Sequence, residues 1–281
     1  GSNRIRFAQA RLLAVSLHTA GVHAKYRCTA HHAQFVWFRR RQEGGESALI
    51  VYRELSSLER DLGIRASTLY AVSNTVERHY HPVSLPKRDG SCRLLSVPDP
   101  QLKRIQRRIA QVLLAPMPVS PYAMAYRYGA SVVRNAAQHV GRPAVLKLDI
   151  RHFFDSILYA SVKEAAFPAE IYGEPLRILL TILCYHRDGL PQGAPSSPAI
   201  SNLVLRAFDD ETAAWCRDRK IRYTRYCDDL TFSGSFEPEA VTAFVREQLR
   251  KRGFFLNEKK SVFVPAGRQQ VVTGIVVNET P

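Results

Sequence analysis

Strand-like and helical runs of apolar residues alternate over the second half of this chain. An apolar run at 145–150 carries an aspartate, Asp149, near its end. A strand-like stretch at 222–233 is interrupted at its centre by two adjacent carboxylates. Apolar residues at helical spacing occupy 199–208 and 238–252. This alternation predicts an α+β fold, in which an antiparallel sheet holds the carboxylates and helices lie behind it.

The first half of the chain has a different pattern. Residues 1 to about 50 contain no motif that assigns them a role. Residues 51–145 have mostly helical periodicity around one hairpin, which spans 84–95 and turns at Asp89-Gly90. No internal repeat or low-complexity tract is present. The sequence therefore predicts an N-terminal extension, a largely helical region and an α+β region, in that order.

Three aspartates in the second half are the strongest chemical feature. Asp228 and Asp229 are adjacent at the predicted turn, and two such charges are costly side by side unless a cation neutralises them. If the strand that ends on Asp149 lies in the same sheet, the three carboxylates can hold two Mg²⁺ ions about 3.5–4 Å apart, the arrangement used for in-line phosphoryl transfer. Each feature also has an ordinary explanation, since Asp pairs are common in turns and an aspartate after a strand can cap a helix.

Four ordered motifs within residues 80–278 resemble the reverse transcriptases. The stretch 149–155 resembles the first palm motif of that family, and 189–198 resembles the motif that carries the template-side glutamine. The stretch 226–229 is similar to the catalytic hairpin, with a cysteine where many relatives have alanine or another small residue. The lysine motif that follows in the family is matched by 253–261.

The resemblance implies a right-hand polymerase fold. Fingers would occupy 51–145 and the palm 146–281, with parts of the fingers inserted, after the extension at 1–50. The thumb would be missing or truncated, because the chain stops three residues after Asn278.

The resemblance also implies the roles of individual residues. Asp149, Asp228 and Asp229 are the expected catalytic residues, and the Ile150 carbonyl joins them as a ligand of two Mg²⁺ ions, for which Mn²⁺ can substitute. Contacts to the incoming deoxynucleotide are expected from several motifs: Lys87 and Arg93 at the triphosphate, Phe154 beneath the sugar, Gln192 at the base or sugar, and Lys260 near the leaving group.

Phe154 favours a DNA product over an RNA product. It follows Asp149 by five residues, where a bulky ring would clash with a ribose 2′-hydroxyl. RNA-dependent RNA polymerases resemble this fold but usually have a carboxylate at that spacing, and Asp155 is one position too late. Phe153 and Phe154 can also fill the core, and we expect one of the two to do so.

Two shorter motifs resemble those of the bacterial retron group. Residues 135–139 match an Asn-Ala-x-x-His motif, and residues 272–274 match a Val-Thr-Gly motif. Retron enzymes copy part of a structured non-coding RNA, prime from an internal guanosine 2′-hydroxyl, and often act with an effector protein in phage defence. Contacts to the cognate RNA are implied for Asn135, His139, Thr273 and Gly274. The pair Asn135 and His139 also fits an i, i+4 pair on a helix surface.

Composition agrees with a nucleic-acid partner. The 281 residues are 46% hydrophobic and carry a net charge of +15, which suits an RNA template and an RNA–DNA hybrid and predicts salt-sensitive binding. Five scattered cysteines without Cys-x-x-Cys spacing argue against a disulfide framework or zinc ribbon and favour a reducing bacterial cytoplasm. No apolar stretch approaches 18 residues, so no membrane segment is predicted.

Three alternatives remain open at this point. The first is a defence-associated or group II intron-type reverse transcriptase without a retron RNA. The second is a template-independent DNA polymerase on the same fold. The third is a non-catalytic RNA-binding scaffold, which the intact set of carboxylates disfavours because converging charges without a metal would be destabilising.

Overall fold

The computed structural model describes residues 52, 54–86, 90 and 92–278, so the extension at 1–50 lies outside the described part. The described chain forms two compact units that are interleaved along the sequence. Residues 119–153 and 205–278 form the first, which we call the sheet unit. The described residues of 52–118 and residues 154–204 form the second, which we call the helical unit.

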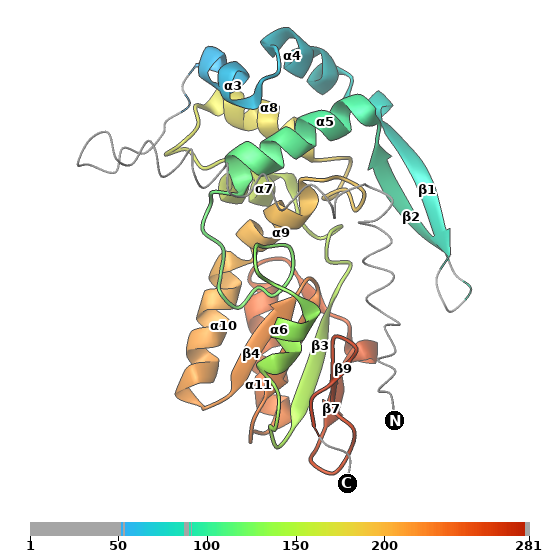
Figure 1. Ribbon diagram of the computed structural model, residues 1–281, viewed down its shortest axis with the longest axis vertical. Coiled ribbons are helices and arrows are strands. Elements are labelled where there is room, and N and C mark those ends of the chain that lie inside the picture. The colour runs from blue at the N-terminus through green and yellow to red at the C-terminus, as the bar shows by residue number, and fades with distance from the viewer. Residues whose placement is uncertain (1–51, 53, 87–89, 91, 279–281) are drawn as a thin grey trace, which may run out of the picture. The chain divides into compact units, whose positions relative to one another are not determined.

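The sheet unit is built on an antiparallel sheet of five strands (Figure 1). Its strand order is β4-β5-β3-β6, and β7 also pairs with β3. The bounds of these strands are β3 Val145–Arg151, β4 Arg222–Tyr226, β5 Asp229–Ser233, β6 Phe255–Leu256 and β7 Val262–Val264. The sequence prediction of an antiparallel sheet formed by the run at 145–150 and the hairpin at 222–233 is confirmed.

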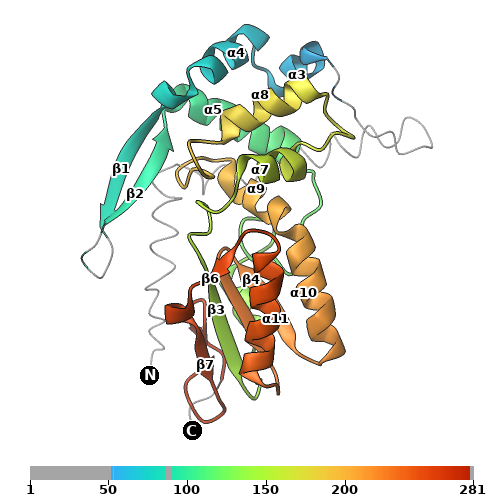
Figure 2. The same cartoon turned by 180° about the vertical axis from the view of Figure 1, so that it is seen from behind.

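Helices and a small hairpin cover the two faces of this sheet. Two long helices lie against one face, as the view from behind shows (Figure 2): α10 Arg206–Asp218 and α11 Pro238–Arg250. On the other face lies α6, Val132–Ala137, with a hairpin of β8 Val271–Val272 and β9 Ile275–Val276 (Figure 1). A 3₁₀ turn, η3 Glu258–Lys260, links β6 to β7. The buried side chains of Ala136, Val145 and Val272 join these elements into one apolar cluster.

The helical unit consists of short helices around one two-stranded hairpin, as predicted for the first half of the chain (Figure 1). Its helices are α3 Leu55–Leu62, α4 Ala66–Asn74, η1 Val76–His79, α5 Pro100–Arg108, η2 Ile109–Leu114, α7 Tyr159–Ala166, α8 Glu174–Cys184 and α9 Ser197–Val204. The hairpin pairs β1 Tyr80–Pro86 with β2 Cys92–Pro98. The buried amide of Gln106 donates to the Tyr80 hydroxyl at 2.7 Å and to the Leu183 carbonyl at 2.9 Å, which ties the hairpin to α5 and α8.

Two sequence expectations differ in detail from the structure. The helix expected at 199–208 begins earlier, at Ser197, and is interrupted at Leu205, so that α9 and α10 are separate helices. The two compact units are interleaved, and the assignment of 51–145 to fingers and 146–281 to palm stays a prediction. Among the described residues no helix is both long and apolar enough to cross a membrane.

Candidate active site

Strand pairing brings the three aspartates together at one end of the sheet unit. Asp149 on β3 lies directly opposite Asp229 on β5 in the antiparallel register. The backbone N–H of Ile150 donates to the carbonyl of Asp228 at 2.9 Å, which joins the tip of the β4–β5 hairpin to β3. The side chain of Asp149 is buried, whereas Asp228 is half-buried and Asp229 is exposed. The expected proximity of these carboxylates is therefore present in the structure.

A strained two-residue turn, Cys227-Asp228, carries one of the adjacent carboxylates, while Asp229, also expected in the turn, is the first residue of β5. Cys227 has a φ of 61°, a left-handed conformation that few non-glycine residues adopt. Its side chain is buried and its sulfur accepts a hydrogen bond from the Tyr126 hydroxyl at 3.3 Å. Burial raises the pKa of the Cys227 thiol, so this cysteine is an inert packing residue and not a nucleophile.

A fully buried ion pair supports the same turn. The Arg225 guanidinium donates to both carboxylate oxygens of Asp209, at 2.8 and 2.6 Å, and to the carbonyl of Cys227 at 3.0 Å. The Tyr223 hydroxyl donates to Asp209 at 2.7 Å. The side chains of Arg225 and Asp209 are 0% exposed, so their charges depend on each other for compensation. The network links α10 to the backbone that precedes Asp228.

Partial desolvation and mutual repulsion raise the pKa values of two of these carboxyl groups. Desolvation, then the charges of Asp228 and Asp149, raise the pKa of Asp229 to about 7. Desolvation and the Asp149 charge likewise raise the pKa of Asp228. Two neighbouring acids whose charged forms are disfavoured form a site that attracts a cation.

Lys260 supplies a positive charge to this cluster. Its ammonium group donates to Asp149 Oδ2 at 2.8 Å, although its side chain is 60% exposed. Partial desolvation opposes the charged form, but the hydrogen bond and charge of Asp149 outweigh it and raise the pKa of Lys260. The lysine that was expected near the leaving group thus contacts one of the three clustered aspartates.

The donors of the site fit a hard divalent cation in type and charge, since they are carboxylates that repel one another. Their arrangement is less complete. Among the described residues, no group of three or more His, Cys, Asp or Glu side chains is arranged to hold a metal ion. Lys260 occupies one oxygen of Asp149, so an ion bound at this carboxylate would share it with the ammonium group or replace that group.

The residues expected at the nucleotide belong to the helical unit, apart from Lys260. Phe153, the last residue of the sheet unit in this segment, is buried with its ring centroid 6.2 Å from that of Phe254, while Phe154 is half-buried. Phe153 is therefore the ring that fills the core, which leaves Phe154 as the candidate sugar contact. Arg93 on β2 is exposed, and Lys87 lies outside the described residues.

Gln192 lines a cavity of about 250 Å³ within the helical unit. Its amide donates to Asp155 at 3.4 Å, a long hydrogen bond. The other polar lining side chains include Ser96, His186 and Asp188. The contact of Gln192 with a base or sugar stays a prediction.

The two glycines beside Gln192 lie where the loop packs closely on other backbone. In the structure, a Cβ at Gly193 would lie 2.6 Å from the Ser96 carbonyl oxygen, and a Cβ at Gly189 would lie 2.8 Å from Asp155 Cα. The glycines thus let the loop pack against its own protein backbone.

The two retron-like motifs meet in the structure, although about 130 residues separate them. Thr273 and Gly274 form the β8–β9 turn with φ values of 46° and 84°, and both central residues of a type I′ turn require positive φ. The Asn135 amide donates to Thr273 Oγ1 at 3.4 Å, and that hydroxyl donates to the Val132 carbonyl at 3.2 Å. These bonds hold a β-branched residue in a strained conformation.

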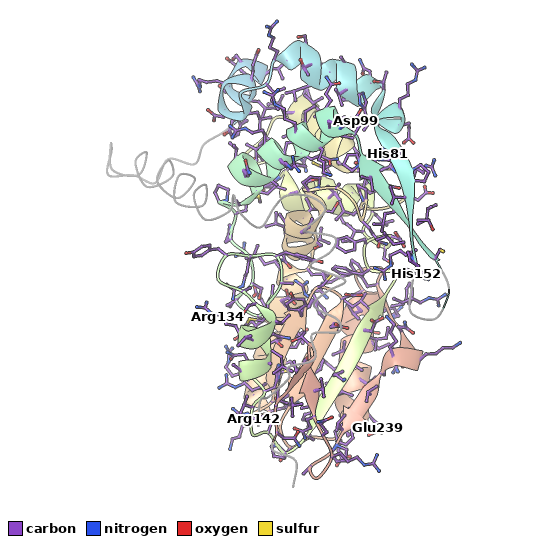
Figure 3. All side chains as sticks on the ribbon, turned by 45° about the vertical axis from the view of Figure 1, so that its right-hand side comes forward. His81, Asp99, Arg134, Arg142, His152 and Glu239 are labelled. Atoms are coloured by element: carbon purple, nitrogen blue, oxygen red, sulfur yellow. The ribbon has the colours of Figure 1, made fainter. Side chains whose placement is uncertain are left out.

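His139 is an interior residue. Its ring nitrogens lie 2.7 Å from Ser233 Oγ and 2.8 Å from Thr224 Oγ1, and its side chain is 0% exposed. Burial, then the charges of Arg142 and Arg222, lower its pKa to about 4 (Arg142 is labelled in Figure 3). Asn135 is also 0% exposed, so in this structure neither side chain is open to RNA, and the surface-pair alternative is wrong for both.

Sequence reasoning missed the Arg225–Asp209 pair. Both residues occupy positions that the apolar pattern assigns to the interior, Asp209 directly after Phe208 on α10 and Arg225 two positions after Tyr223 on β4. Two opposite charges at interior positions of neighbouring elements are the signal that could have identified them.

Comparison with known proteins shows the family of this chain. The family model described as "Reverse transcriptase (RNA-dependent DNA polymerase)" matches residues 85–275. The Retron Mx65 reverse transcriptase of Myxococcus xanthus is 37% identical over 256 residues, covering 83% of this chain and 60% of the relative. The Retron Ec86 reverse transcriptase of Escherichia coli is 29% identical over 235 residues, covering 82% of this chain and 73% of the relative.

A solved structure shows a similar fold at low sequence identity. It is an apo telomerase from Candida tropicalis truncated from its C-terminal domain, with a TM-score of 0.50 and 13% identity, covering 69% of this chain and 52% of that chain. The match of the family model and the identity to the Myxococcus relative show that the chain belongs to the reverse transcriptase family. Within that family it is of the retron type. The chain spans about 60% of the length of the first of these relatives.

Proposed function

We propose that this chain is an RNA-directed DNA polymerase of the retron type, which copies a structured non-coding RNA into DNA by nucleotidyl transfer. The observation that carries the proposal is the pairing of Asp149 with the Asp228-Asp229 turn across β3 and β5. Three mutually repelling carboxylates at the end of a sheet have little structural use, whereas a polymerase needs them to bind metal ions.

The two compact units correspond, in this proposal, to the parts of a right-hand polymerase. The sheet unit is the core of the palm, because it carries all three aspartates. The helical unit contains the β1–β2 hairpin and belongs to the fingers and adjoining palm.

The carboxylates of Asp149, Asp228 and Asp229, with the Ile150 carbonyl, would hold two divalent ions, Mg²⁺ with Mn²⁺ as a substitute. When bound, such ions lower the pKa of the primer hydroxyl and neutralise the triphosphate. Lys260, which donates to Asp149 in the structure, would be close enough to these groups to bind or protonate the leaving pyrophosphate. The Arg225–Asp209 pair holds the turn that carries Asp228.

Selection of the incoming deoxynucleotide would fall to residues of the helical unit. Phe154 excludes the ribose 2′-hydroxyl by its bulk, and Gln192 contacts the base or sugar. Arg93 on β2 would bind the triphosphate through its planar guanidinium, and Lys87 would bind it as a point charge.

The RNA template and the growing hybrid would be bound by shape and backbone charge, in line with the net charge of +15. The β8–β9 turn, with Thr273 and Gly274, is the candidate contact for a cognate RNA. Location in a bacterial cytoplasm is supported by the free thiols of Cys92, Cys184, Cys216 and Cys227. An effector partner and a role in phage defence rest on the family resemblance alone.

The test is primer extension on an RNA template with deoxynucleotides and Mg²⁺, comparing the unmodified chain with Asp228→Asn. Asp218→Asn, an exposed position at the end of α10, is the matched control. We expect template-directed DNA from the unmodified chain and from the control, and only background from Asp228→Asn. Product without added template would indicate a template-independent polymerase. Absence of product from all three, also with Mn²⁺, would contradict the proposal and favour an RNA-binding scaffold.

A further inference from the structure

Lys147 is a charged residue of the sheet that the proposed chemistry does not use. It lies on β3 two positions before Asp149, and alternate residues of a strand share one face. The register sets it opposite Thr231 on β5 and opposite Val262 on β7. Because Asp149 is paired with Asp229, this alternation places Lys147 on the same side of the sheet as the carboxylates.

The surroundings of Lys147 leave its ammonium group available. The side chain is half-buried, and no hydrogen bond or ion pair joins it to another described residue. Two positions further back on the same face, Val145 is covered by α6 and the β8–β9 hairpin. Lys147 is therefore the one residue of β3 between the carboxylates and the covered part of this face.

The chemistry assigns opposite sides of the carboxylates to the two substrates. In an in-line displacement the attacking primer hydroxyl and the departing pyrophosphate lie on opposite sides of the reacting phosphorus. Phe154, the residue proposed to lie under the sugar of the incoming nucleotide, follows Asp149 along the chain, beyond the end of β3. If the nucleotide lies past that end of the strand, the primer end lies on the other side of the carboxylates, towards Lys147.

We propose that the Lys147 ammonium group binds a phosphodiester of the primer strand, about two nucleotides behind its 3′ end. From Lys147 to Asp149 the strand spans about 6.6 Å, at roughly 3.3 Å per residue. Phosphates of one nucleic-acid strand are spaced at about 3.4 Å along the helix axis. With that axis along β3, the distance from Asp149 to Lys147 corresponds to about two nucleotide steps. The inference rests on the proposed polymerase function and adds a contact to it.

Lys147 is a positioning residue in this inference. It does not touch the reacting atoms, and it fixes the primer so that the 3′-hydroxyl meets the carboxylate site. A lysine that served only as a counter-charge for Asp229 would produce a different result. Its removal would change the metal concentration needed for activity and leave primer binding unaltered.

The first test measures binding of a primed RNA template by fluorescence anisotropy, with Ca²⁺ in place of Mg²⁺ to prevent extension. Lys147→Gln is compared with Lys251→Gln, which removes the same charge at an exposed position after α11, on the far side of the sheet. We expect Lys147→Gln to raise Kd about fivefold and to reduce the slope of log Kd against log salt by about one unit. Lys251→Gln should leave both quantities close to those of the unmodified chain. Equal effects of the two variants would overturn the inference.

The second test locates the contact with uncharged methylphosphonate linkages placed one at a time at the first four positions behind the primer 3′ end. In the unmodified chain, one linkage near the second position should weaken binding about as much as Lys147→Gln does. In Lys147→Gln the same linkage should have no further effect, because the charge pair is already broken. Independent, multiplicative effects at every position would show that Lys147 does not bind the primer backbone.

Failure of this inference is distinguishable from failure of the proposed function. If the unmodified chain extends the primer and the two changes act independently, only the Lys147 contact is wrong. If the unmodified chain neither extends nor binds a primed template, with Mg²⁺ or Mn²⁺, the polymerase function is wrong and the contact that depends on it is also excluded.

Discussion

Arg225 and Asp209 form a bidentate ion pair that is 0% exposed, and the same guanidinium holds the carbonyl of Cys227 at 3.0 Å. The pair therefore couples a helix behind the sheet to the strained turn that carries Asp228. Replacing both charges by apolar residues can be neutral for stability in proteins, but removing one leaves the other uncompensated. This arrangement predicts that the pair serves the geometry of the turn as well as the fold.

Arg225→Lys tests this role because lysine keeps the charge but loses the planar fork. One ammonium group cannot donate to both Asp209 oxygens and to the Cys227 carbonyl in the same geometry. We expect the free energy of unfolding to fall by about 1–3 kcal/mol, and kcat for deoxynucleotide addition to fall about tenfold with little change in KM. Chemical denaturation and steady-state extension measure the two effects.

Arg222→Lys is the matched control, because Arg222 is exposed on the same strand. It should leave both stability and kcat nearly unchanged. A variant Arg225→Lys that is less stable yet has an unaltered kcat, at a temperature where it is fully folded, would limit the pair to a structural role.

Much of this site follows from local sequence rules. The hairpin at 222–233 forms because β-branched and aromatic residues flank a turn-forming pair. The run at 145–150 is a short, mostly apolar segment, which favours a buried strand. Once β3 and β5 are antiparallel neighbours, Asp149 and Asp229 must lie at the same end of the sheet. We expected one of Phe153 and Phe154 to fill the core, and only the structure identifies Phe153 as the buried residue.

Other features depend on partners that no local pattern reveals. His139 has the spacing of a helix-surface residue relative to Asn135, yet both residues are buried. Hydroxyl groups of β4 and β5 pair with the His139 imidazole, and the Asn135 amide donates to Thr273. Gly193, next to Gln192, packs against the backbone of β2, about a hundred residues earlier in the chain, a contact that the local sequence does not reveal. Tertiary contacts decide whether a polar side chain is buried, so the sequence pattern alone placed Asn135 and His139 on the surface when both are in the interior.

The buried imidazole of His139 makes stability depend on pH. Its folded pKa is about 4 against 6.5 for an exposed histidine, so the unfolded chain binds more protons between these values. Stability is therefore lost as pH falls from 6.5 towards 4. We expect the free energy of unfolding to be about 2 kcal/mol lower at pH 5 than at pH 7 from this group.

Urea denaturation of His139→Gln at both pH values isolates this contribution. The variant should be less stable at pH 7, because its amide cannot reproduce both hydrogen bonds, but its loss between pH 7 and pH 5 should be about 2 kcal/mol smaller. His81→Gln is the control, since His81 is exposed on β1 (labelled in Figure 3). An identical pH dependence in His139→Gln and the unmodified chain would show that His139 does not titrate as its burial implies.

Phe154→Ala should relax the choice between deoxyribose and ribose. The half-buried ring is the candidate barrier to a 2′-hydroxyl, and its removal opens that space. We expect the ratio of kcat/KM for dNTP over NTP to fall at least tenfold, a difference of about 1.4 kcal/mol. Single-nucleotide incorporation of dGTP and GTP opposite one template cytosine measures this ratio.

Phe255→Ala is the control for loss of an aromatic ring, because Phe255 is 60% exposed on β6. Its discrimination ratio should match that of the unmodified chain. Unchanged discrimination in Phe154→Ala would remove Phe154 from the proposed sugar contact.

Gly193→Ala should displace the loop that carries Gln192. The added methyl group would meet the Ser96 carbonyl oxygen at 2.6 Å and Val97 Cα at 3.0 Å, and both are strand backbone of β2 that cannot rotate away. We expect a loss of about 1–3 kcal/mol in unfolding free energy and a KM for dNTP raised several-fold, because the loop must move away from the strand.

Gly253→Ala is the comparison, since its Cβ meets nothing within 4 Å and only its φ of 78° is unfavourable. That variant should lose stability by about 1 kcal/mol without any change in KM. If the two variants have the same KM, close packing of the loop on β2 does not position Gln192 for the nucleotide.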